Sequence, residues 1–239
     1  MNKEIKILYL YHDMLNLYGE SGNVRILEKR LTDNGFSVVI DRKTIGDEID
    51  MSGYCVVYIG SGTESKLRRC APHFVGLKAQ LERYIDEGKI LLATGNAYEL
   101  LGRSITDGDG EKIECAGLFG FEATHDFSHR KTGDVICSCS FIEEKIVGFI
   151  NNCSTITGLT EPMLTFELGG CGAMGDGVRR ANAFGTYVTG PILVKNPYFL
   201  EYVMGIICDM HGVEKTQADE QGYQYQGYRI TVSELMRDR

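Results

Sequence analysis

The stretch Leu91-Leu92-Ala93-Thr94-Gly95-Asn96-Ala97-Tyr98-Glu99-Leu100-Leu101-Gly102 decides the fold of this chain. Its apolar start predicts a buried strand, and the residues from Gly95 onward predict a tight turn and the opening of a helix. This is the form of a nucleophile elbow, which holds a reactive side chain at the end of a sheet beside a helix N-terminus. Gly95 stands at the tip of the turn and has no side chain to react. The stretch therefore predicts the framework of an active site without its nucleophile.

Strand-like and helix-like segments alternate before the elbow, which indicates a parallel sheet covered on both faces. Apolar runs predict strands at 5–11, 36–40, 54–59 and 90–93, and apolar residues at helical spacing predict helices at 22–34 and 77–85. We therefore expect an α/β fold of three layers, with a mostly parallel central sheet flanked by helices.

The second half of the chain has a different pattern. Short strands without helices between them are predicted at 115–124, 134–142, 146–150, 163–168 and 183–188, so this half is expected to be antiparallel or mixed. A surface turn is expected at 107–110, a flexible glycine-rich loop at 169–177 and a last helix at 197–211. One domain, 1–211, and a polar Tyr/Gln-containing tail, 212–239, are the predicted organisation.

Composition narrows the classes of function. The 239 residues have a net charge of −8 and contain no cluster of basic residues, which argues against nucleic acid as a partner. No segment has the ~20 apolar residues of a membrane span or the pattern of a signal peptide, so we expect a cytoplasmic protein. The eight cysteines show no C-x-x-C pair and no zinc-ligand spacing, so neither disulfides nor a metal is predicted, and no cofactor is implied.

Three loops are expected at the carboxyl ends of strands, where open α/β sheets bind ligands. The first holds Gly60, Ser61 and Gly62, whose backbone amides are candidates for an oxyanion hole or ligand loop, together with Asn96 after the elbow. The second is the elbow itself. The third is the sharp turn Gly185-Thr186-Tyr187-Val188-Thr189-Gly190-Pro191.

Four motifs in this order resemble the triad-type (class I) glutamine amidotransferase domain, with a flavodoxin-like fold. They are 13–23 (DMLNLYGESGN), 98–102 (YELLG), 129–134 (HRKTGD) and 185–197 (GTYVTGPILVKNP). Within that superfamily the chain is most similar to the cobyric acid synthase-like branch, and specifically to the glutaminase subunits (GatD) of lipid II isoglutaminyl synthase. The resemblance covers about residues 5–205.

The resemblance implies a cysteine at the elbow that attacks the side-chain amide of glutamine, a histidine base, and ammonia passed to a Mur-ligase-type partner in peptidoglycan precursor amidation. This chain departs from the pattern at both catalytic positions. Gly95 stands at the nucleophile position, and Thr189 stands where the histidine is expected. Glu99 replaces a common glutamine, and 149–154 (FINNCS) lacks the expected histidine as well. The expected consequence is a glutaminase-like chain without glutaminase activity.

Few other residues are candidates to replace the missing cysteine nucleophile and histidine base. Thr94 is expected to point into the sheet region. Cys153, with His125 or His129, forms an alternative nucleophile and base, but a buried cysteine and surface histidines are the favoured interpretation. The carboxylates of Asp107, Asp109, Asp176 and Glu64 are interpreted mostly as solvated loop charges.

Arg130 has two interpretations of equal weight. In the resembled subunit, an arginine in this motif is associated with glutamine binding, and a guanidinium suits a carboxylate. Alternatively, Arg130 anchors its loop to a nearby aspartate.

Three functional hypotheses follow. The first is an inactive, partner-binding scaffold or regulator. The second is an amidohydrolase with a non-standard nucleophile, and the third is a sensor of glutamine or a related amino acid.

Overall fold

The computed structural model describes residues 3–237, so the first two residues of the predicted domain and the last two of the tail lie outside the described part. A six-stranded sheet forms the centre, in the order β13-β14-β4-β3-β1-β2. Only the edge pair β13–β14 is antiparallel; the other four pairs are parallel. The strands are β1 (Glu4–Leu10), β2 (Ser37–Lys43), β3 (Val56–Ile59), β4 (Ile90–Thr94), β13 (Val178–Arg180) and β14 (Ala183–Thr186).

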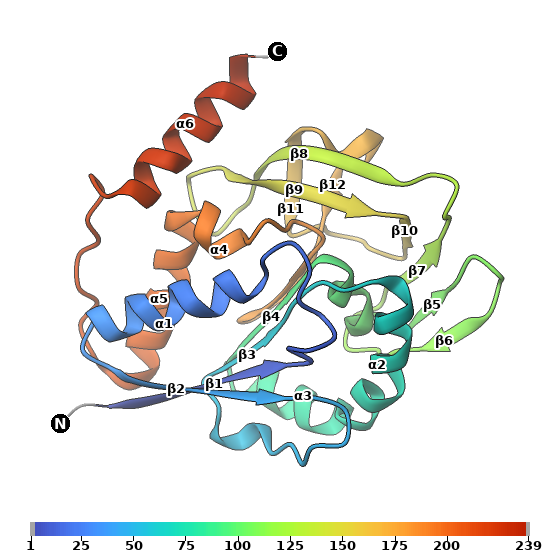
Figure 1. Ribbon diagram of the computed structural model, residues 1–239, viewed down its shortest axis with the longest axis horizontal. Coiled ribbons are helices and arrows are strands. Elements are labelled where there is room, and N and C mark those ends of the chain that lie inside the picture. Colours follow the sequence, from blue (N-terminus) through green and yellow to red (C-terminus); the bar gives the residue numbers. More distant parts are fainter. Residues whose placement is uncertain (1–2, 238–239) are drawn as a thin grey trace.

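Helices cover both faces of this sheet, as Figure 1 shows, and the predicted three-layer α/β fold is confirmed. Helices α1, α4 and α5 contact one another on one face, and α2 and α3 lie on the other. The helices are α1 (Ser21–Asp33), α2 (Glu64–Gly76), α3 (Lys78–Asp86), α4 (Ile192–Lys195), α5 (Pro197–His211) and α6 (Tyr223–Arg237), with 3-10 helices η1 (Met51–Gly53), η2 (Gly95–Leu101) and η3 (Gly170–Gly172).

The second half of the chain builds two four-stranded sheets, in the orders β10-β7-β5-β6 and β12-β11-β8-β9. All their pairs are antiparallel except β5–β7, so the predicted mixed character is confirmed. The strands are β5 (Ser104–Thr106), β6 (Lys112–Glu114), β7 (Glu122–His125), β8 (Lys131–Ser138), β9 (Ile146–Asn152), β10 (Ser154–Thr157), β11 (Leu164–Leu168) and β12 (Gly175–Asp176).

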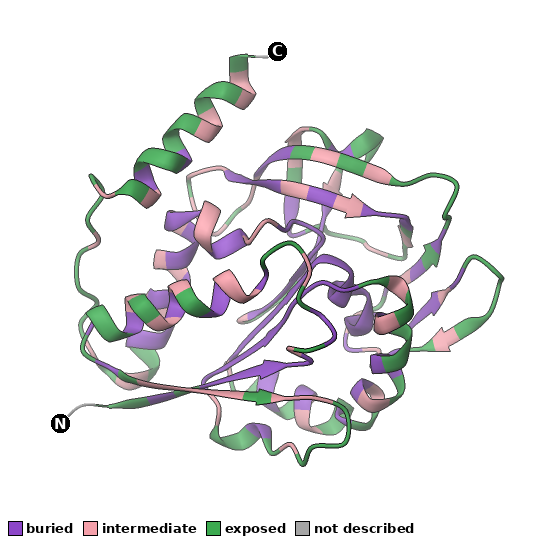
Figure 2. Cartoon of the chain, in the orientation of Figure 1, coloured by how far each residue is buried: buried purple, intermediate pink, exposed green. Residues whose placement is uncertain are grey.

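The core is continuous from the central sheet into η2. The central strands β3 and β4 are buried at every position, which explains their mainly apolar sequences, and all seven residues of η2 are buried as well. Figure 2 shows this burial at the middle of the molecule, with exposed residues on the outer surfaces of the helices. In the described part of the chain, no helix is both long and apolar enough to cross a membrane.

Three segments differ from their predictions. Residues 64–76, for which no element was predicted, form α2, in which Pro72 interrupts the helical signal. The strand predicted at 115–124 is present only as β7, at its C-terminal end. The glycine-rich loop at 169–177 includes the short elements η3 and β12.

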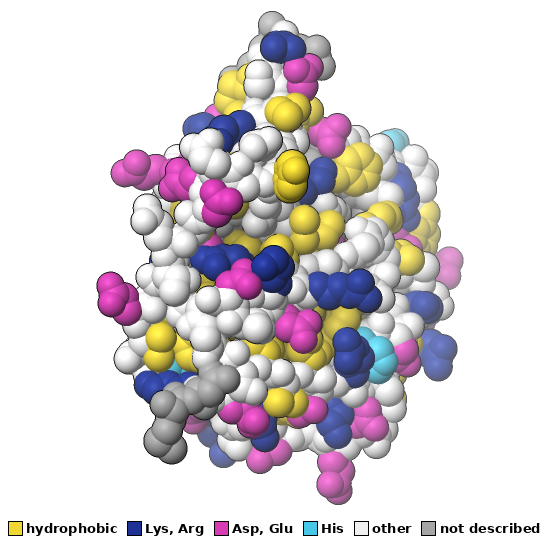
Figure 3. Space-filling view, turned by 60° about the vertical axis from the view of Figure 1, so that its left-hand side comes forward, with side chains coloured by type: hydrophobic (Ala, Val, Ile, Leu, Met, Phe, Trp, Pro, Cys, Tyr) yellow, Lys and Arg dark blue, Asp and Glu magenta, His cyan; other side chains and the backbone are white. Residues whose placement is uncertain are grey.

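The predicted tail contains a helix, α6. Tyr225 and Tyr228 of α6 are buried and pack edge-on against Tyr198 of α5. The C-terminal end of α6 projects beyond the body, at the top of Figure 3.

Candidate functional site

The elbow at Gly95 keeps its turn but has no space for a side chain. Gly95 has φ of +61°, a conformation that residues with a Cβ rarely adopt. A Cβ added at this position would lie 2.3 Å from the hydroxyl oxygen of Ser61 and 2.4 Å from its Cβ. Ser61 therefore occupies the position that a nucleophile would need.

Thr189 faces the same point from the third loop. Its Cγ2 would lie 3.1 Å from a Cβ at position 95, so the fold brings the nucleophile and base positions together. The hydroxyl of Thr189 donates to the carbonyl of Phe149 at 2.9 Å. A threonine hydroxyl cannot act as a base at neutral pH, so this pair offers neither an attacking group nor a proton acceptor.

The segment after the elbow is a 3-10 helix, and not the α-helix suggested by the sequence. All seven residues of η2 are buried, and its amides follow the tighter i to i+3 pattern. The element that directly follows the elbow is therefore not an α-helix.

The first loop binds to the elbow through Asn96. The side chain of Asn96 accepts from the Gly62 amide at 2.9 Å and donates to the Gly62 carbonyl at 2.8 Å. Ser61 donates to the same Asn96 oxygen at 3.3 Å. The Gly62 amide, a predicted oxyanion donor, thus has an internal partner. The hydroxyl of Ser61 faces an amide oxygen, which is too weak a base to activate it.

The loop also packs closely on the segment before α1. A Cβ at Gly60 would lie 2.6 Å from the carbonyl oxygen of Leu15, and one at Gly62 would lie 2.4 Å from the Leu15 side chain. These glycines are therefore required for packing, whatever their role in binding.

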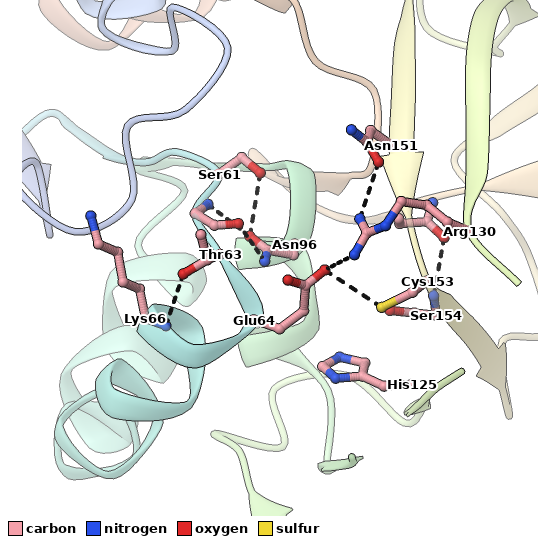
Figure 4. A network of polar contacts seen from close by, with 12 residues as sticks. Ser61, Thr63, Glu64, Lys66, Asn96, His125, Arg130, Asn151, Cys153 and Ser154 are labelled. Atoms are coloured by element: carbon pink, nitrogen blue, oxygen red, sulfur yellow. Dashed lines mark hydrogen bonds and ion pairs between the residues drawn. The ribbon is translucent and has the colours of Figure 1, made fainter. Parts of the chain in front are cut away.

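Arg130 is held by an acidic side chain, Glu64, at the start of α2. Its guanidinium lies 2.6 Å from the Glu64 carboxylate and donates to the side chain of Asn151 at 3.1 Å. This ion pair has the form of the anchoring interpretation, with a glutamate in place of the expected aspartate. Figure 4 shows the three side chains converging from α2, β9 and the loop before β8.

The ion pair affects both of its members. Burial raises the pKa of Glu64, but the hydrogen bond and charge of Arg130, a backbone hydrogen bond and the Cys153 thiol together outweigh burial, and the net pKa lies below its ordinary value. The pKa of Arg130 rises through the same hydrogen bond. Both groups are therefore charged at neutral pH. Glu64 is half-buried, which corrects its interpretation as a solvated charge.

Cys153 is buried, as expected, and is a poor nucleophile. Its thiol lies 3.5 Å from the Glu64 carboxylate. Burial, aided by the charge of Glu64, raises the pKa of Cys153 to about 11. The reactive form of a cysteine is the thiolate, so this thiol is inert at neutral pH.

The expectation of two surface histidines is right for His129 and wrong for His125. The side chain of His129 is 82% exposed, whereas that of His125 is 4% exposed and lies 2.7 Å from the buried carboxylate of Glu99. Burial lowers the pKa of His125, but the hydrogen bond to Glu99 and the negative charges of Glu99 and Glu64 together outweigh burial, so the net pKa is above its ordinary value.

Glu99 is the centre of a buried network that sequence reasoning did not identify. It accepts from Ser154 at 2.6 Å and from the hydroxyl of Tyr187 at 2.9 Å, besides its contact with His125. The substitution of glutamate for the glutamine of the resembled family was the available signal. It could not disclose the partner, because His125 is distant in sequence and comes from β7.

Glu20 forms a second buried network behind the elbow. Its carboxylate accepts from Tyr58 at 2.5 Å and from Thr94, whose side chain points into the sheet as predicted. Burial raises the pKa of Glu20 to about 7, although both hydrogen bonds act in the opposite direction. The sequence placed Glu20 in the first motif but gave it no role.

Two further carboxylates are buried, contrary to the prediction of solvated charges. Asp107 pairs with Arg68 of α2. Asp176 accepts from Thr186 and from the backbone amide of Tyr187, and burial raises its pKa to about 6. Asp109 lies in an exposed turn. In the described residues, no three His, Cys, Asp or Glu side chains gather as a metal site would require.

Several of the side chains described above line a cavity of about 260 Å³, which we call the elbow cavity. Its lining includes Tyr18, Glu64, Asn96, Glu99, Arg130 and Cys153. Asn151 donates to the hydroxyl of Tyr18 at 3.0 Å, so a chain of contacts from Tyr18 through Asn151 and Arg130 to Glu64 runs along the cavity. The elbow cavity is thus polar, with its charges mutually paired.

Comparisons with known proteins agree with this geometry. The model of the CobB/CobQ-like glutamine amidotransferase domain matches residues 6–197. The GatD subunit of lipid II isoglutaminyl synthase (glutamine-hydrolyzing) from Streptococcus pneumoniae is 27% identical, over 81% of this chain and 76% of the relative. The GatD subunit from Staphylococcus aureus is also 27% identical, over 88% of this chain and 87% of the relative.

Solved structures share the fold at lower identity. A chain of the PurLQS structure from Thermotoga maritima has a TM-score of 0.54 and 16% identity, covering 88% of this chain and all (100%) of that one. A glutamine amidotransferase crystal structure has the same TM-score and identity, covering 84% of this chain and 98% of that one.

Proposed function

The chain belongs to the CobB/CobQ-like glutamine amidotransferase domain family, and from that premise we propose that it is a member without glutaminase activity. In this proposal it binds a Mur-ligase-like partner subunit as a scaffold or regulator of lipid II amidation. The observation that supports the loss of activity is the elbow, where Ser61 fills the position of the nucleophile and Thr189 stands at the position of the base. The printed name of the two GatD relatives supports the pathway.

The alternative nucleophiles are disfavoured on chemical grounds. The thiol of Cys153 has a pKa of about 11. His125 is bound to Glu99, and the hydroxyl of Ser61 faces only a weak acceptor in Asn96. In the described residues, neither Cys153 nor Ser61 is hydrogen-bonded to a histidine, the base that most often activates a serine or cysteine nucleophile.

A glutamine hydrolysis assay on the purified chain tests the loss of activity. We expect ammonia release no faster than the buffer background, and the same result for Cys153→Ala and Ser61→Ala. Turnover by the natural chain that either substitution abolishes would overturn the proposal and identify the nucleophile. An active GatD subunit assayed in parallel serves as the positive control.

The role as an amino-acid sensor is disfavoured by the Arg130–Glu64 ion pair. A ligand carboxylate would have to displace Glu64 from the guanidinium, and the 2.6 Å contact is charge-assisted. Calorimetric titration with millimolar glutamine should therefore show no binding. Saturable binding to the natural chain would favour the sensor.

Co-expression with a Mur-ligase-like protein encoded beside this chain tests the partner. We expect a complex that survives size-exclusion chromatography and that supports amidation from free ammonia but not from glutamine. Failure to recover a complex would remove the scaffold role, and amidation driven by glutamine would contradict the loss of hydrolysis.

A further inference from the structure

A second and larger cavity, of about 610 Å³, lies next to the elbow cavity. Asn152 and Ser154 line both cavities, so the corner between β9 and β10 is their shared wall. The remaining lining comes from Lys131 of β8, Ile150 of β9, β10, the loop that follows it, β11, the glycine-rich segment 170–177, Tyr98 and Tyr187. A volume of this size falls in the range of small-molecule sites, roughly 300–1,000 Å³.

Much of the wall is apolar. Ile150, Phe166 and Leu159 present hydrocarbon surface to the cavity, with Ile156 and Pro162 beside them. Sites with mainly apolar walls and a few placed polar groups are typical of organic ligands. The wall therefore favours a ligand with an apolar body. In this it differs from the elbow cavity, which is polar and has paired charges.

Two polar groups of the lining lack adequate partners. Among the described residues, the buried hydroxyl of Tyr98 has no hydrogen-bond partner. A buried polar group without a partner is unfavourable, because it has lost its hydrogen bonds to water without replacement. Lys131 is half-buried, and its ammonium donates to the carbonyl of Ser154 at 3.1 Å. Over residues 3–237, Lys131 forms no ion pair. The cavity thus offers an uncompensated positive charge and a free phenol.

The acidic residue of the lining does not neutralise Lys131. Asp176 is occupied by Thr186 and the Tyr187 amide. The strand register also separates the two residues. Lys131 pairs with Asn152 at one end of β8, whereas Asp176 pairs with Leu164 of β11, which joins β8 at its other end. A ligand anion at Lys131 would therefore lie well away from the Asp176 carboxylate.

We propose that this cavity binds a small organic carboxylate with an apolar, ring-sized body, whose carboxylate pairs with Lys131 and whose far polar group bonds to the hydroxyl of Tyr98. This site is separate from the elbow and does not depend on the proposed loss of hydrolysis. Because Tyr98 and Glu99 are consecutive on η2, an occupant would contact the same element that lines the elbow cavity.

The absence of tryptophan from the sequence makes the site accessible to fluorescence. Met174 lines the cavity and is 88% exposed, so Met174→Trp places a single reporter there without disturbing the core. The probes are 3-(4-hydroxyphenyl)propionate, its neutral amide, and 3-phenylpropionate, which lacks the hydroxyl. Calorimetry on the natural chain checks that the reporter does not create the binding.

The proposal predicts a specific pattern across probes and variants. The hydroxylated carboxylate should bind saturably, and its amide at least tenfold more weakly. Lys131→Met should weaken the carboxylate about tenfold and leave the amide unchanged, whereas Lys112→Met, on the exposed edge strand β6, should change neither. Tyr98→Phe should weaken the hydroxylated probe and not 3-phenylpropionate. The proposal would be overturned if the hydroxylated carboxylate showed no saturable binding at concentrations up to about 10 mM. Binding that is insensitive to Lys131→Met would overturn it as well.

Discussion

Ser61 and Gly95 show how two residues decide whether chemistry is available at the elbow. The positive φ of Gly95 is the backbone conformation that an elbow needs, and the chain keeps it. The Ser61 side chain then fills the adjacent space, and Asn96 holds the loop in place through Gly62. The space beside Gly95 is therefore not empty, because the Ser61 side chain fills it.

Substitution of Gly95 tests this packing. Gly95→Ala should lower the free energy of unfolding by about 2–5 kcal/mol, since a Cβ at positive φ costs about 1–2 kcal/mol and overpacking adds about 1–3 kcal/mol. Urea denaturation of the purified chain measures the change.

The double variant Ser61→Gly/Gly95→Ala separates the two contributions. Removal of the Ser61 side chain should relieve the overpacking and leave the backbone contribution, so the two substitutions should couple by at least 1 kcal/mol, the typical scale for contacting residues. Additive effects would contradict the clash.

The sequence located the elbow residues but not the buried polar groups around them. The sequence indicates which residues lie at the elbow because each of them follows the end of a strand in a recognisable motif: Gly95, Asn96, Ser61 and Thr189. The sequence pattern places His125 at the surface because it does not reveal its partner, Glu99, which lies in η2 and not in β7. A contact between residues 26 apart in sequence depends on how β7 packs against η2, and local pattern carries no information about that.

At the scale of elements, the parallel sheet was predictable and the additions to it were not. Strands β3 and β4 have mainly apolar sequences because they are buried at every position, and β1 becomes fully buried only from Ile7 onward. Helix α2 was missed because Pro72 and several charged residues weaken its apolar pattern. Helix α6 was missed because its buried face consists of tyrosines, whose hydroxyls make the segment look polar.

Tyr228 is the residue on which the docking of α6 depends. It contacts Tyr198, and its hydroxyl donates to the carbonyl of Lys145 at 2.9 Å. Tyr228→Ala should detach α6 from the body without unfolding the sheet, because truncating a buried aromatic residue costs about 3–5 kcal/mol.

Hydrogen exchange provides the measurement. Amide protection in α6 should fall at least tenfold in Tyr228→Ala, while that of β3 and β4 is retained. Ile230→Ala, at a position 63% exposed on the same helix, is the matched control and should have little effect. Unchanged protection of α6 in Tyr228→Ala would show that other contacts hold the helix.

For the whole molecule, the buried carboxyl of Glu20 links stability to pH. It joins the segment before α1 to β3 and β4 through Tyr58 and Thr94. Burial raises its pKa from 4.5 to about 7, so the folded state retains a proton that the unfolded state releases. The stability this proton provides is complete below pH 4.5 and is lost as the pH rises to about 7.

A comparison of the natural chain with Glu20→Gln measures this linkage. The free energy of unfolding of the natural chain minus that of the variant should decrease by about 3 kcal/mol between pH 4.5 and about 7. Above that interval the difference should stay constant. Asp176 is present in both chains, so its own linkage cancels. A difference independent of pH would show that Glu20 does not titrate in this range.

The position of the Ser61 side chain also bears on the mutational paths open to this protein. A return from Gly95 to cysteine by a single substitution would meet the Ser61 hydroxyl and Cβ before any thiol could reach a substrate. Restoring the base at Thr189 alone would provide a histidine with nothing to activate. Under the loss of hydrolysis proposed above, recovery would need at least three coordinated substitutions, and we expect the first of them to lower stability while giving no activity. The close packing at the elbow would then make the reaction much easier to lose than to recover.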